Sequence, residues 1–294
     1  DGLIEEVGYF SSELVQNGDF SELGSELVTN GTFNTDLSNW TESNVTAQRD
    51  TFVFPNGSAK VTVISGAFTF IKQTVSGLVV GKTYRLNADL FTPNTNTNTD
   101  VATIGIAESS FNSTNSISTD ATETIQNKSL YFTASSTSQI IYLSVVKANY
   151  SQFGTSGSVG YFDNVSVKQV DPNNRWTLVD TKFTGANTFE NTATNGRIFQ
   201  SFTTIVGSKY KVSFTLNSGT WNIYASTNNN SSGQIVSTGQ TTASGFFKFT
   251  ATATTSFLAI YNIGASGSAA SITNISVVEV QGDRPRLSYD ITNG

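Results

Sequence analysis

The segment ELVQNGDFSELGSELVTNGTF, residues 13–33, contains one short motif twice. ELVQNGDF (13–20) returns as ELVTNGTF (26–33), and only SELGS (21–25) separates the two copies. Apolar residues followed by Asn-Gly are typical of a strand that ends in a tight turn. Five residues cannot hold a folded domain, so the doubling has to be explained by the rest of the chain.

The composition indicates an all-β protein. The chain has 294 residues, of which 37% are hydrophobic and only 13% charged, and it contains 21 Phe and 10 Tyr. Much of the remainder is Thr, Ser, Asn and Gly. Aromatic and β-branched residues favour half-buried strands, whereas Asn and Gly favour turns. The length allows two domains with cores of their own.

Several chemistries are excluded by residue types that the chain lacks. It contains no Cys, Met or His, which removes disulfides, thiolate nucleophiles, structural zinc sites and Ser-His-Asp triads. Carboxylate chemistry and oxygen ligands for cations such as Ca²⁺ stay available. A net charge of −6 with only 16 scattered basic residues argues against nucleic acid, and no apolar run is long enough for membrane insertion.

Four segments of the first half return in the same order in the second half. The pairs are 27–33 with 178–183, 71–91 with 199–216, 130–145 with 246–263, and 161–170 with 271–280. In the second pair, Gly81 and Tyr84 match Gly207 and Tyr210. Alternating side chains throughout these segments predict antiparallel hairpins. The chain therefore contains two copies of one domain.

The repeats predict two tandem antiparallel β-sandwiches, with residues 51–54 and 58–65 as two extra strands of the first and 92–100 as a polar loop. The expected boundaries are an extended N-terminal segment or linker (1–25), the first domain (26–170), a linker (171–175), the second domain (176–280) and a connector to further sequence (281–294).

The repeated motifs resemble those of a known family. ELVTNGTF followed by LSNW (37–40), a mid-domain Gly-turn hairpin and YFDNVSV (161–167) are similar to carbohydrate-binding modules of the family 4/9 type, which are jelly-roll sandwiches. More narrowly, the pattern looks like modules of bacteriophage tail and head fibres and other virion structural proteins. Residues 282–294 resemble the connector that follows such modules.

The resemblance implies a structural Ca²⁺ in the first domain. The matching ligand positions are Asp163 on the closing strand with side chains or carbonyls near Thr32 and Asn34, and oxygen ligands suit this hard cation. The family often carries an acidic residue where Asn34 stands, and the alternative reading of Asp163 is a surface residue that caps a turn. The second copy has Thr273 at that position, so we expect no metal there.

Aromatic side chains are the candidates for sugar stacking. Phe33, Trp40 and Tyr84 lie in fold motifs and are expected in the core. Trp221 is also expected inside because it alternates with Ile223, which leaves Tyr224 on the other face. The candidates for carbohydrate binding are three rings in or beside the loop at 151–160, and the alternative for each is packing on its own domain: Tyr150, Phe153 and Tyr161.

Three functions follow from these patterns. The first is a structural or adhesive component of an extracellular appendage such as a phage fibre, located extracellularly or on a virion, with a cell-surface glycan as a partner. The second is a non-catalytic carbohydrate-binding module pair of a secreted polysaccharide-degrading enzyme. The third is a catalytic jelly roll. No acid and base at a fixed separation are recognisable, so we expect no enzyme.

Self-association is expected from the resemblance to fibre proteins, which are usually homo-oligomers and often trimers. Residues 26–33 are followed by a whole domain, so they are its opening strand. Residues 13–20 then have no domain that directly follows them, and an unpaired strand tends to add to an exposed sheet edge. We expect residues 13–20 against such an edge, in this chain or in a neighbouring subunit; the alternative is an extended linker.

Overall fold

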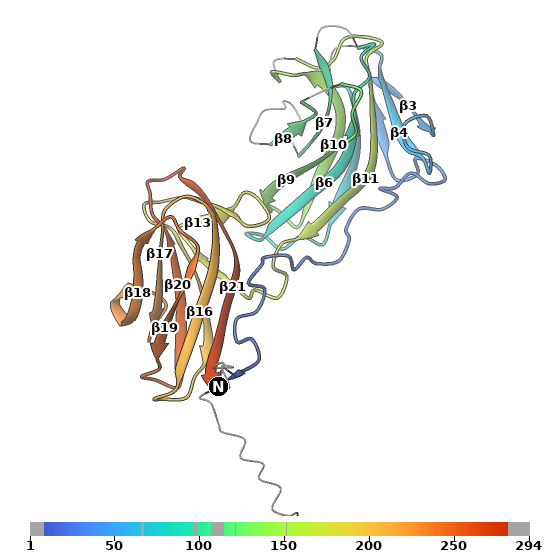
Figure 1. Cartoon of the computed structure of the whole chain (residues 1–294). Coiled ribbons are helices and arrows are strands. Elements are labelled where there is room, and N and C mark those ends of the chain that lie inside the picture. The colour runs from blue at the N-terminus through green and yellow to red at the C-terminus, as the bar shows by residue number, and fades with distance from the viewer. Residues whose placement is uncertain are drawn as a thin grey trace, which may run out of the picture. The chain divides into compact units, whose positions relative to one another are not determined.

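The protein consists of two all-β domains (Figure 1). The computed structural model describes residues 9–65, 68–96, 99–106, 115–120, 122–150 and 152–281. Residues 22–172 form one compact unit, which we call the inserted domain. The described residues 9–21 and 173–281 together form the other, which we call the split domain. The predicted connector at 282–294 lies outside the described residues.

The inserted domain is a sandwich of two five-stranded antiparallel sheets. The first, called the β10 sheet, has the order β2 (Thr41–Ser43), β5 (Phe70–Ser76), β10 (Ser138–Lys147), β7 (Asp100–Gly105) and β8 (Ser116–Ser118). The second, called the β11 sheet, has the order β3 (Val45–Asp50), β4 (Ser58–Val63), β11 (Val159–Gln169), β6 (Thr83–Phe91) and β9 (Gln126–Thr133).

The split domain repeats this arrangement strand for strand. Its β20 sheet has the order β12 (Thr177–Val179), β15 (Arg197–Thr203), β20 (Thr255–Asn262), β17 (Trp221–Ser226) and β18 (Gln234–Thr241). Its β21 sheet has the order β13 (Thr181–Phe183), β14 (Thr188–Asn191), β21 (Ala269–Gln281), β16 (Lys209–Ser218) and β19 (Gly245–Thr250), and β1 (Tyr9–Phe10) also pairs with β21.

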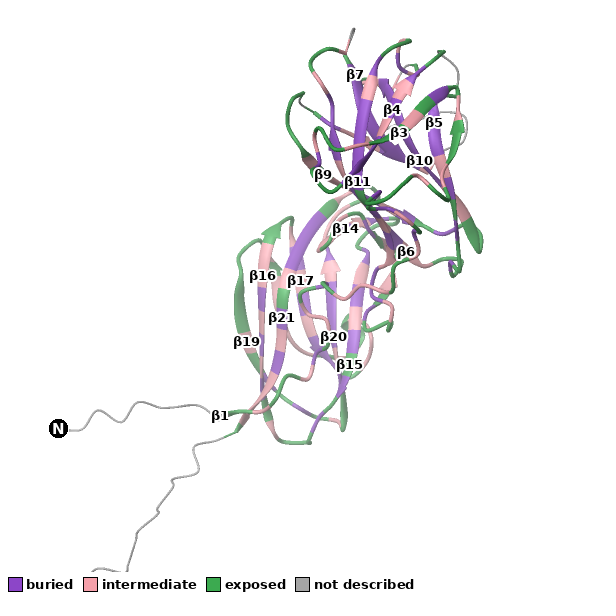
Figure 2. Cartoon of the chain, turned by 90° about the vertical axis from the view of Figure 1, so that its right-hand side faces the viewer, coloured by how far each residue is buried: buried purple, intermediate pink, exposed green. Residues whose placement is uncertain are grey.

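The predicted fold class is confirmed. The helical content of the described residues is one 3₁₀ turn, η1 (Ser231–Gly233), and none of their helices could cross a membrane. Each core lies between two sheets, where alternate side chains are buried (Figure 2). As expected, Phe33, Tyr84 and Trp221 are 1% exposed or less, and Trp40 packs against the core.

The Gly-turn hairpins confirm the internal repeat at the level of single hydrogen bonds. Gly81 and Gly207 have φ angles of 82° and 84°, which side chains with a Cβ rarely adopt. Three residues on, the hydroxyl of Tyr84 accepts the backbone N–H of Val79 at 2.9 Å. The Tyr210 hydroxyl likewise accepts that of Ile205 at 2.8 Å. A buried tyrosine thus closes the same turn in both domains.

Residues 13–20 are the opening segment of the split domain. The Glu13 carboxylate accepts the backbone N–H of Val277 on β21 at 2.7 Å. The side-chain amide of Gln200 on β15 accepts the N–H of Gln16 at 2.7 Å and donates to its carbonyl at 2.9 Å. The segment therefore bonds to both sheets of the split domain, although it precedes the inserted domain in the chain.

Phe20, at the end of this segment, is a centre of the split-domain core. It is 2% exposed, and its ring centroid lies 5.3 Å from Trp176, 5.0 Å from Phe189 and 6.1 Å from Phe183. The Trp176 indole also donates to the carbonyl of Asn17 at 2.9 Å. Burying one Phe contributes about 1.5–3 kcal/mol, so the segment is a part of the core.

Residues 26–33 make the same contacts in the inserted domain. Glu26 accepts the N–H of Val167 at 2.8 Å. The amide of Gln73 accepts the N–H of Thr29 and donates to its carbonyl, both at 2.8 Å. The Trp40 indole donates to the carbonyl of Asn30 at 3.1 Å. The motif occurs twice in the sequence because each domain contains one copy of it.

The Asn-Gly pair has a steric cause. A Cβ on Gly18 would lie 1.9 Å from the carbonyl oxygen of Ile275, and one on Gly31 would lie 2.0 Å from that of Val165. At both places the N–H of the closing strand donates to the glycine carbonyl at 2.9 Å. Only glycine allows the two backbones to approach this closely.

The predicted boundaries differ from the structure at the opening of the second domain. Residues 13–20 lie against β21 in this chain, as expected, but they do not form a regular strand. They are therefore not a linker. Residues 178–183 contribute β12 and β13, the counterparts of β2 and β3. Residues 58–65 contain β4, whose counterpart is β14, and residues 51–54 are not a strand. Neither segment is therefore an extra strand.

Candidate functional site

The three predicted carbohydrate-binding rings are divided between two sheet faces. Tyr150 and Phe153 pack on Phe70, Tyr142 and Val146, on the outer face of the β10 sheet. Tyr161 packs with Phe54 and Phe91 on the outer face of the β11 sheet and is 7% exposed. The three rings therefore do not form one site.

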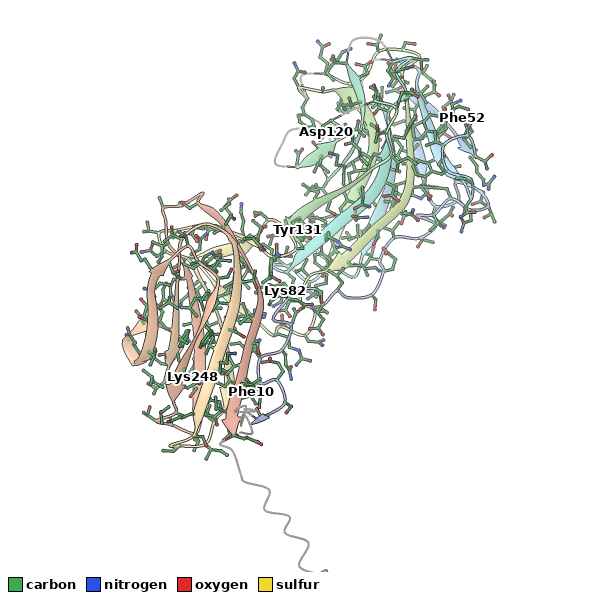
Figure 3. All side chains as sticks on the ribbon, viewed as in Figure 1. Phe10, Phe52, Lys82, Asp120, Tyr131 and Lys248 are labelled. Carbon is green, nitrogen blue, oxygen red and sulfur yellow. The ribbon has the colours of Figure 1, made fainter. Side chains whose placement is uncertain are left out.

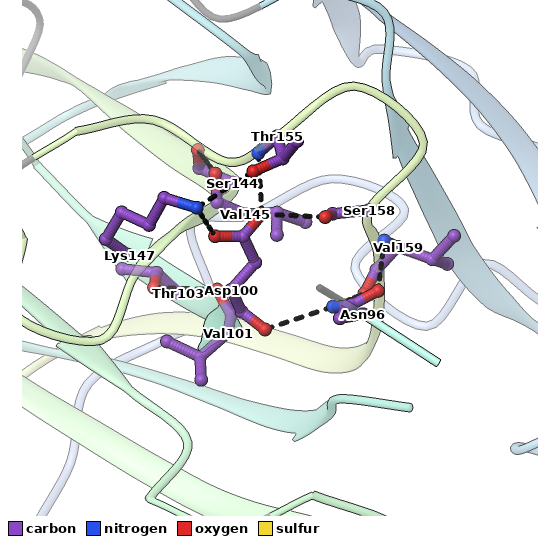
Figure 4. Close-up of polar contacts among 10 residues, drawn as sticks. All are labelled: Asn96, Asp100, Val101, Thr103, Ser144, Val145, Lys147, Thr155, Ser158 and Val159. Carbon is purple, nitrogen blue, oxygen red and sulfur yellow. Dashed lines mark hydrogen bonds and ion pairs between the residues drawn. The ribbon is translucent and has the colours of Figure 1, made fainter. Parts of the chain in front are cut away.

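The loop that carries Tyr150 and Phe153 is fastened by a buried ion pair. The Asp100 carboxylate lies 2.6 Å from Nζ of Lys147 and accepts the Thr155 N–H at 2.6 Å and the Ser158 hydroxyl at 2.7 Å (Figure 4). Burial opposes ionisation of Asp100, but these partners outweigh it and hold its pKa below the ordinary value. Tyr150 and Phe153 thereby cover part of the β10 sheet.

The corresponding face of the split domain has a much shorter connection, residues 263–268 between β20 and β21, and it carries four aromatic side chains. Phe199 extends from β15, Tyr224 from β17, and Phe257 and Tyr261 from β20; all four are partly exposed. The intervening residues, such as Ile198, Ile223 and Leu258, are buried, because successive strand residues point to opposite faces.

These rings surround one small residue. In the strand register Phe199 and Tyr224 both pair with Ala259, which lies between Phe257 and Tyr261 along β20. The ring centroids of Phe199 and Phe257 are 6.4 Å apart, and those of Tyr224 and Tyr261 are 5.4 Å apart at 76°. The result is a nearly continuous aromatic surface on one sheet.

Polar groups frame this surface at one end. Arg197 and Asn222 both pair with Tyr261. The Arg197 guanidinium lies 5.7 Å from the Tyr261 ring centre and donates to the carbonyl of Asn229 at 3.1 Å. Asn222 donates to the Tyr224 hydroxyl at 2.6 Å. Partial burial, with the nearby Tyr261, raises the pKa of Tyr224. We call this set the ring face: Arg197, Phe199, Asn222, Tyr224, Phe257 and Tyr261.

A hollow of about 540 Å³ adjoins the ring face at the β12 edge of the sheet. Phe199 and Ser201 of β15 line it on one side and Glu13 and Gln16 of the opening segment on another, and Arg175, just before β12, completes it. Phe199 thus belongs to both surfaces.

The predicted calcium ligands do not fit a metal site as arranged here. Nε of Arg49 donates to the carbonyls of Phe33 and Asn34 at 3.0 and 2.9 Å. A divalent cation on those oxygens would face this guanidinium. Thr32 is exposed, and the described residues contain no group of three or more His, Cys, Asp or Glu side chains that could hold a metal.

Asp163 has a different environment from that predicted. It pairs in register with Asp89 across β11 and β6, is 7% exposed and accepts the N–H of Asn164 at 2.7 Å. Burial, supplemented by repulsion from Asp89, raises its pKa to about 6. Asp163 therefore keeps its proton to a higher pH than an ordinary aspartate.

A smaller aromatic cluster lies on the β21 sheet. Nζ of Lys211 is 4.8 Å from the ring centre of Phe246 and 5.4 Å from that of Phe10. Figure 3 labels Phe10 and Lys248 in this part of the split domain. The two rings are 63% and 49% exposed. The ring face has four rings and adjoins a hollow, so it is the stronger candidate.

Sequence reasoning identified one member of the ring face, Tyr224, through its alternation with Trp221. The same signal is present for Phe199 between Ile198 and Gln200, and for Phe257 and Tyr261 around Leu258 and Ile260. That these strands are neighbours in one sheet, and that the covering loop is short, depends on the tertiary pairing.

No protein-family profile and no curated protein matches the chain. Solved structures do show similarity. The tandem family 22 carbohydrate-binding modules of Paenibacillus barcinonensis Xyn10C match at 11% identity and a TM-score of 0.40, covering 89% of this chain and 99% of that one. The N-terminal cellulose-binding domain of Cellulomonas fimi β-1,4-glucanase C matches at 20% and 0.31, covering 50% of this chain and 97% of that one.

Part of the tailspike protein 4 of bacteriophage CBA120 also matches, at 15% identity and a TM-score of 0.34, over 49% of this chain and 21% of that one. Similarity at this level carries no argument about what this chain binds.

Proposed function

We propose that the chain is a non-catalytic saccharide-binding protein and that its binding surface is the ring face of the split domain. The observation that carries the proposal is the set of four partly exposed rings on three neighbouring strands of one sheet. Monomeric domains rarely leave such aromatic surfaces open without a ligand.

The chemistry of the ring face suits a sugar. Flat rings offer apolar area to the C–H face of a pyranose, while amides and guanidinium groups offer hydrogen bonds to its hydroxyls. With about 1 kcal/mol or slightly more from each of several contacts, we expect a dissociation constant of roughly 0.1–1 mM for a short oligosaccharide.

Binding is favoured over hydrolysis by the composition of the sheet. Glycosidases use two carboxylates on either side of the scissile bond. The five strands of the β20 sheet, all of which are described, contain neither Asp nor Glu. The ring face therefore provides stacking and hydrogen bonding without an acid and base of its own.

For the biological setting, we propose an adhesive part of an extracellular appendage such as a phage fibre. The support is the resemblance of the repeated motifs and of residues 282–294 to fibre modules and their connector. A module pair of a secreted polysaccharide-degrading enzyme is the alternative. Antibodies raised against the chain would distinguish the two. Labelling of intact phage particles supports the appendage, and labelling of a secreted enzyme supports the alternative.

A glycan array tests the binding itself. The whole chain should bind a restricted set of saccharides. Tyr261→Ala should reduce that binding about tenfold, because it removes one stacking ring and its contacts with the neighbouring rings. The matched control is Phe52→Ala, which removes a ring that is 85% exposed on the inserted domain. Equal binding by both variants, or no binding by the wild-type chain, would refute the proposal.

A further inference from the structure

We infer that the saccharide bound at the ring face is anionic, with acidic groups that pair with Arg197 and Arg175. This inference rests on the proposed function of the ring face and adds the class of ligand. Its basis is the charge of the sheet and the hollow at the edge of the sheet.

The β20 sheet is positively charged within an acidic protein. The net charge of the chain is −6, yet the five strands of this sheet contain one charged residue, Arg197, and no acid. One guanidinium nitrogen of Arg197 bonds to Asn229. Its two terminal nitrogens have no hydrogen-bond partner among the residues that the structure describes. They present four N–H donors beside the Tyr261 ring.

Arg175 lies at the opposite end of the ring face. Thr177 pairs with Phe199, so two residues earlier the chain runs beside Ser201, and Arg175 lines the hollow together with Phe199 and Ser201. From Arg197 to Ser201 along β15 is four residues, or about 13 Å at 3.3 Å per residue. That span suits an oligosaccharide with acidic groups at two places better than a single sugar.

The one carboxylate that lines this hollow is held by the backbone through one of its two oxygens, Oε1. Glu13 accepts the N–H groups of Leu14 and Val15, both at 3.0 Å, and that of Val277 at 2.7 Å. These N–H groups fix the position of the Glu13 side chain. Glu13 thus holds the opening segment in place, and Arg175 supplies the cation of the hollow.

Guanidinium groups pair with carboxylates and with sulfates in the same forked geometry. The shared chemistry is therefore an oxyanion on a sugar, and a uronic acid and a sulfated sugar are its two sources. Stacking on Phe199 and Tyr224 would orient the sugar rings while the two arginines select for charge.

The test is isothermal titration of the whole chain with matched pairs of probes. Polygalacturonate is compared with its carboxyl-reduced form, and chondroitin sulfate with unsulfated chondroitin. We expect at least tenfold tighter binding of the charged member of one pair, and the pair identifies the source. Arg197→Gln and Arg175→Gln should each weaken that binding about five- to tenfold, and high salt should weaken it further.

Lys248→Gln is the matched control, since it removes one positive charge from the β21 sheet of the same domain. Equal affinity for both members of each pair, or no binding of any of the four probes, overturns the inference. So does a loss with Lys248→Gln as large as with Arg197→Gln. Neutral glycans that still bind on the array and need Tyr261 would leave the proposed function intact.

Discussion

Phe20→Ala should destabilise the split domain and leave the inserted domain unchanged. The ring is 2% exposed and lies within 6.1 Å of three other aromatic rings. Replacing such a Phe by Ala costs about 3–5 kcal/mol, a large part of the 5–15 kcal/mol that a domain usually has. At about 3–5 °C per kcal/mol, the melting temperature should fall by roughly 10–20 °C.

Scanning calorimetry of the whole chain measures this, with one transition for each domain. Phe33→Ala is the matched control, because Phe33 is 0% exposed at the same motif position in the inserted domain. Pulse proteolysis with mass spectrometry assigns each transition to its residues. If Phe20→Ala lowers the transition of residues 22–172, or moves neither transition, the assignment of residues 13–20 to the split domain is refuted.

Four further results are expected. Because burial raises the pKa of Asp163 to about 6 from 3.8, the folded state holds this proton more tightly than the unfolded state. The inserted domain should then lose stability as the pH rises from 4 through 6, by at most about 3 kcal/mol and by about 1–2 kcal/mol after solvent screening. Urea unfolding of Asp163→Asn should lack this slope, and an unchanged slope would contradict it. Asp100→Asn leaves Lys147 without its charged partner, so proteolysis within residues 148–158 should become faster; an unaltered rate would argue against the fastening role of the ion pair. Gly18→Ala should lower only the melting transition of the split domain, because its Cβ would meet a carbonyl oxygen at 1.9 Å, whereas a wild-type melting profile would show that the backbone yields there. Added calcium should leave the melting temperatures of both domains unchanged. If calcium instead stabilises the inserted domain and Asp163→Ala abolishes that stabilisation, the metal site predicted from the sequence is present.

The repeated blocks and the core rings could be predicted from the sequence because they are local signals. Period-2 alternation identified the hairpins at 71–91 and 199–216, and the Gly-turn with Tyr84 or Tyr210 is encoded within a few residues. The doubled motif was recognised as well, and it marked two domain openings. The sequence did not show which strands each copy of the motif contacts.

The split of the second domain could not be predicted, because its evidence spans the inserted domain. Glu13 meets Val277, and Gln16 meets Gln200, with a complete sandwich between them in the sequence. Residues 178–183 share apolar letters with 27–33, and this local likeness suggested the wrong opening. Phe20 identifies residues 13–20 as the opening segment, because its ring packs in the core beside Trp176.

The candidate site was harder to predict than the fold. Tyr150 and Phe153 lie in a Gly- and Ser-rich loop that looks exposed in sequence, but Asp100 and Lys147 fasten that loop onto its own sheet. The ring face needs the register of three strands, in which Phe199, Ala259 and Tyr224 are neighbours. The spacing of residues within one strand does not show which residues of the other strands are its neighbours.

The most direct test of the saccharide-binding surface is a nuclear magnetic resonance titration of the whole chain, with its aromatic side chains labelled, using the strongest saccharide from the array. The ring signals of Phe199, Tyr224 and Tyr261 should shift with one common dissociation constant, while that of Tyr161 in the inserted domain stays in place. Shifts confined to Tyr161, or to the loop rings of the inserted domain, with the ring face unchanged at saturation, would contradict the account.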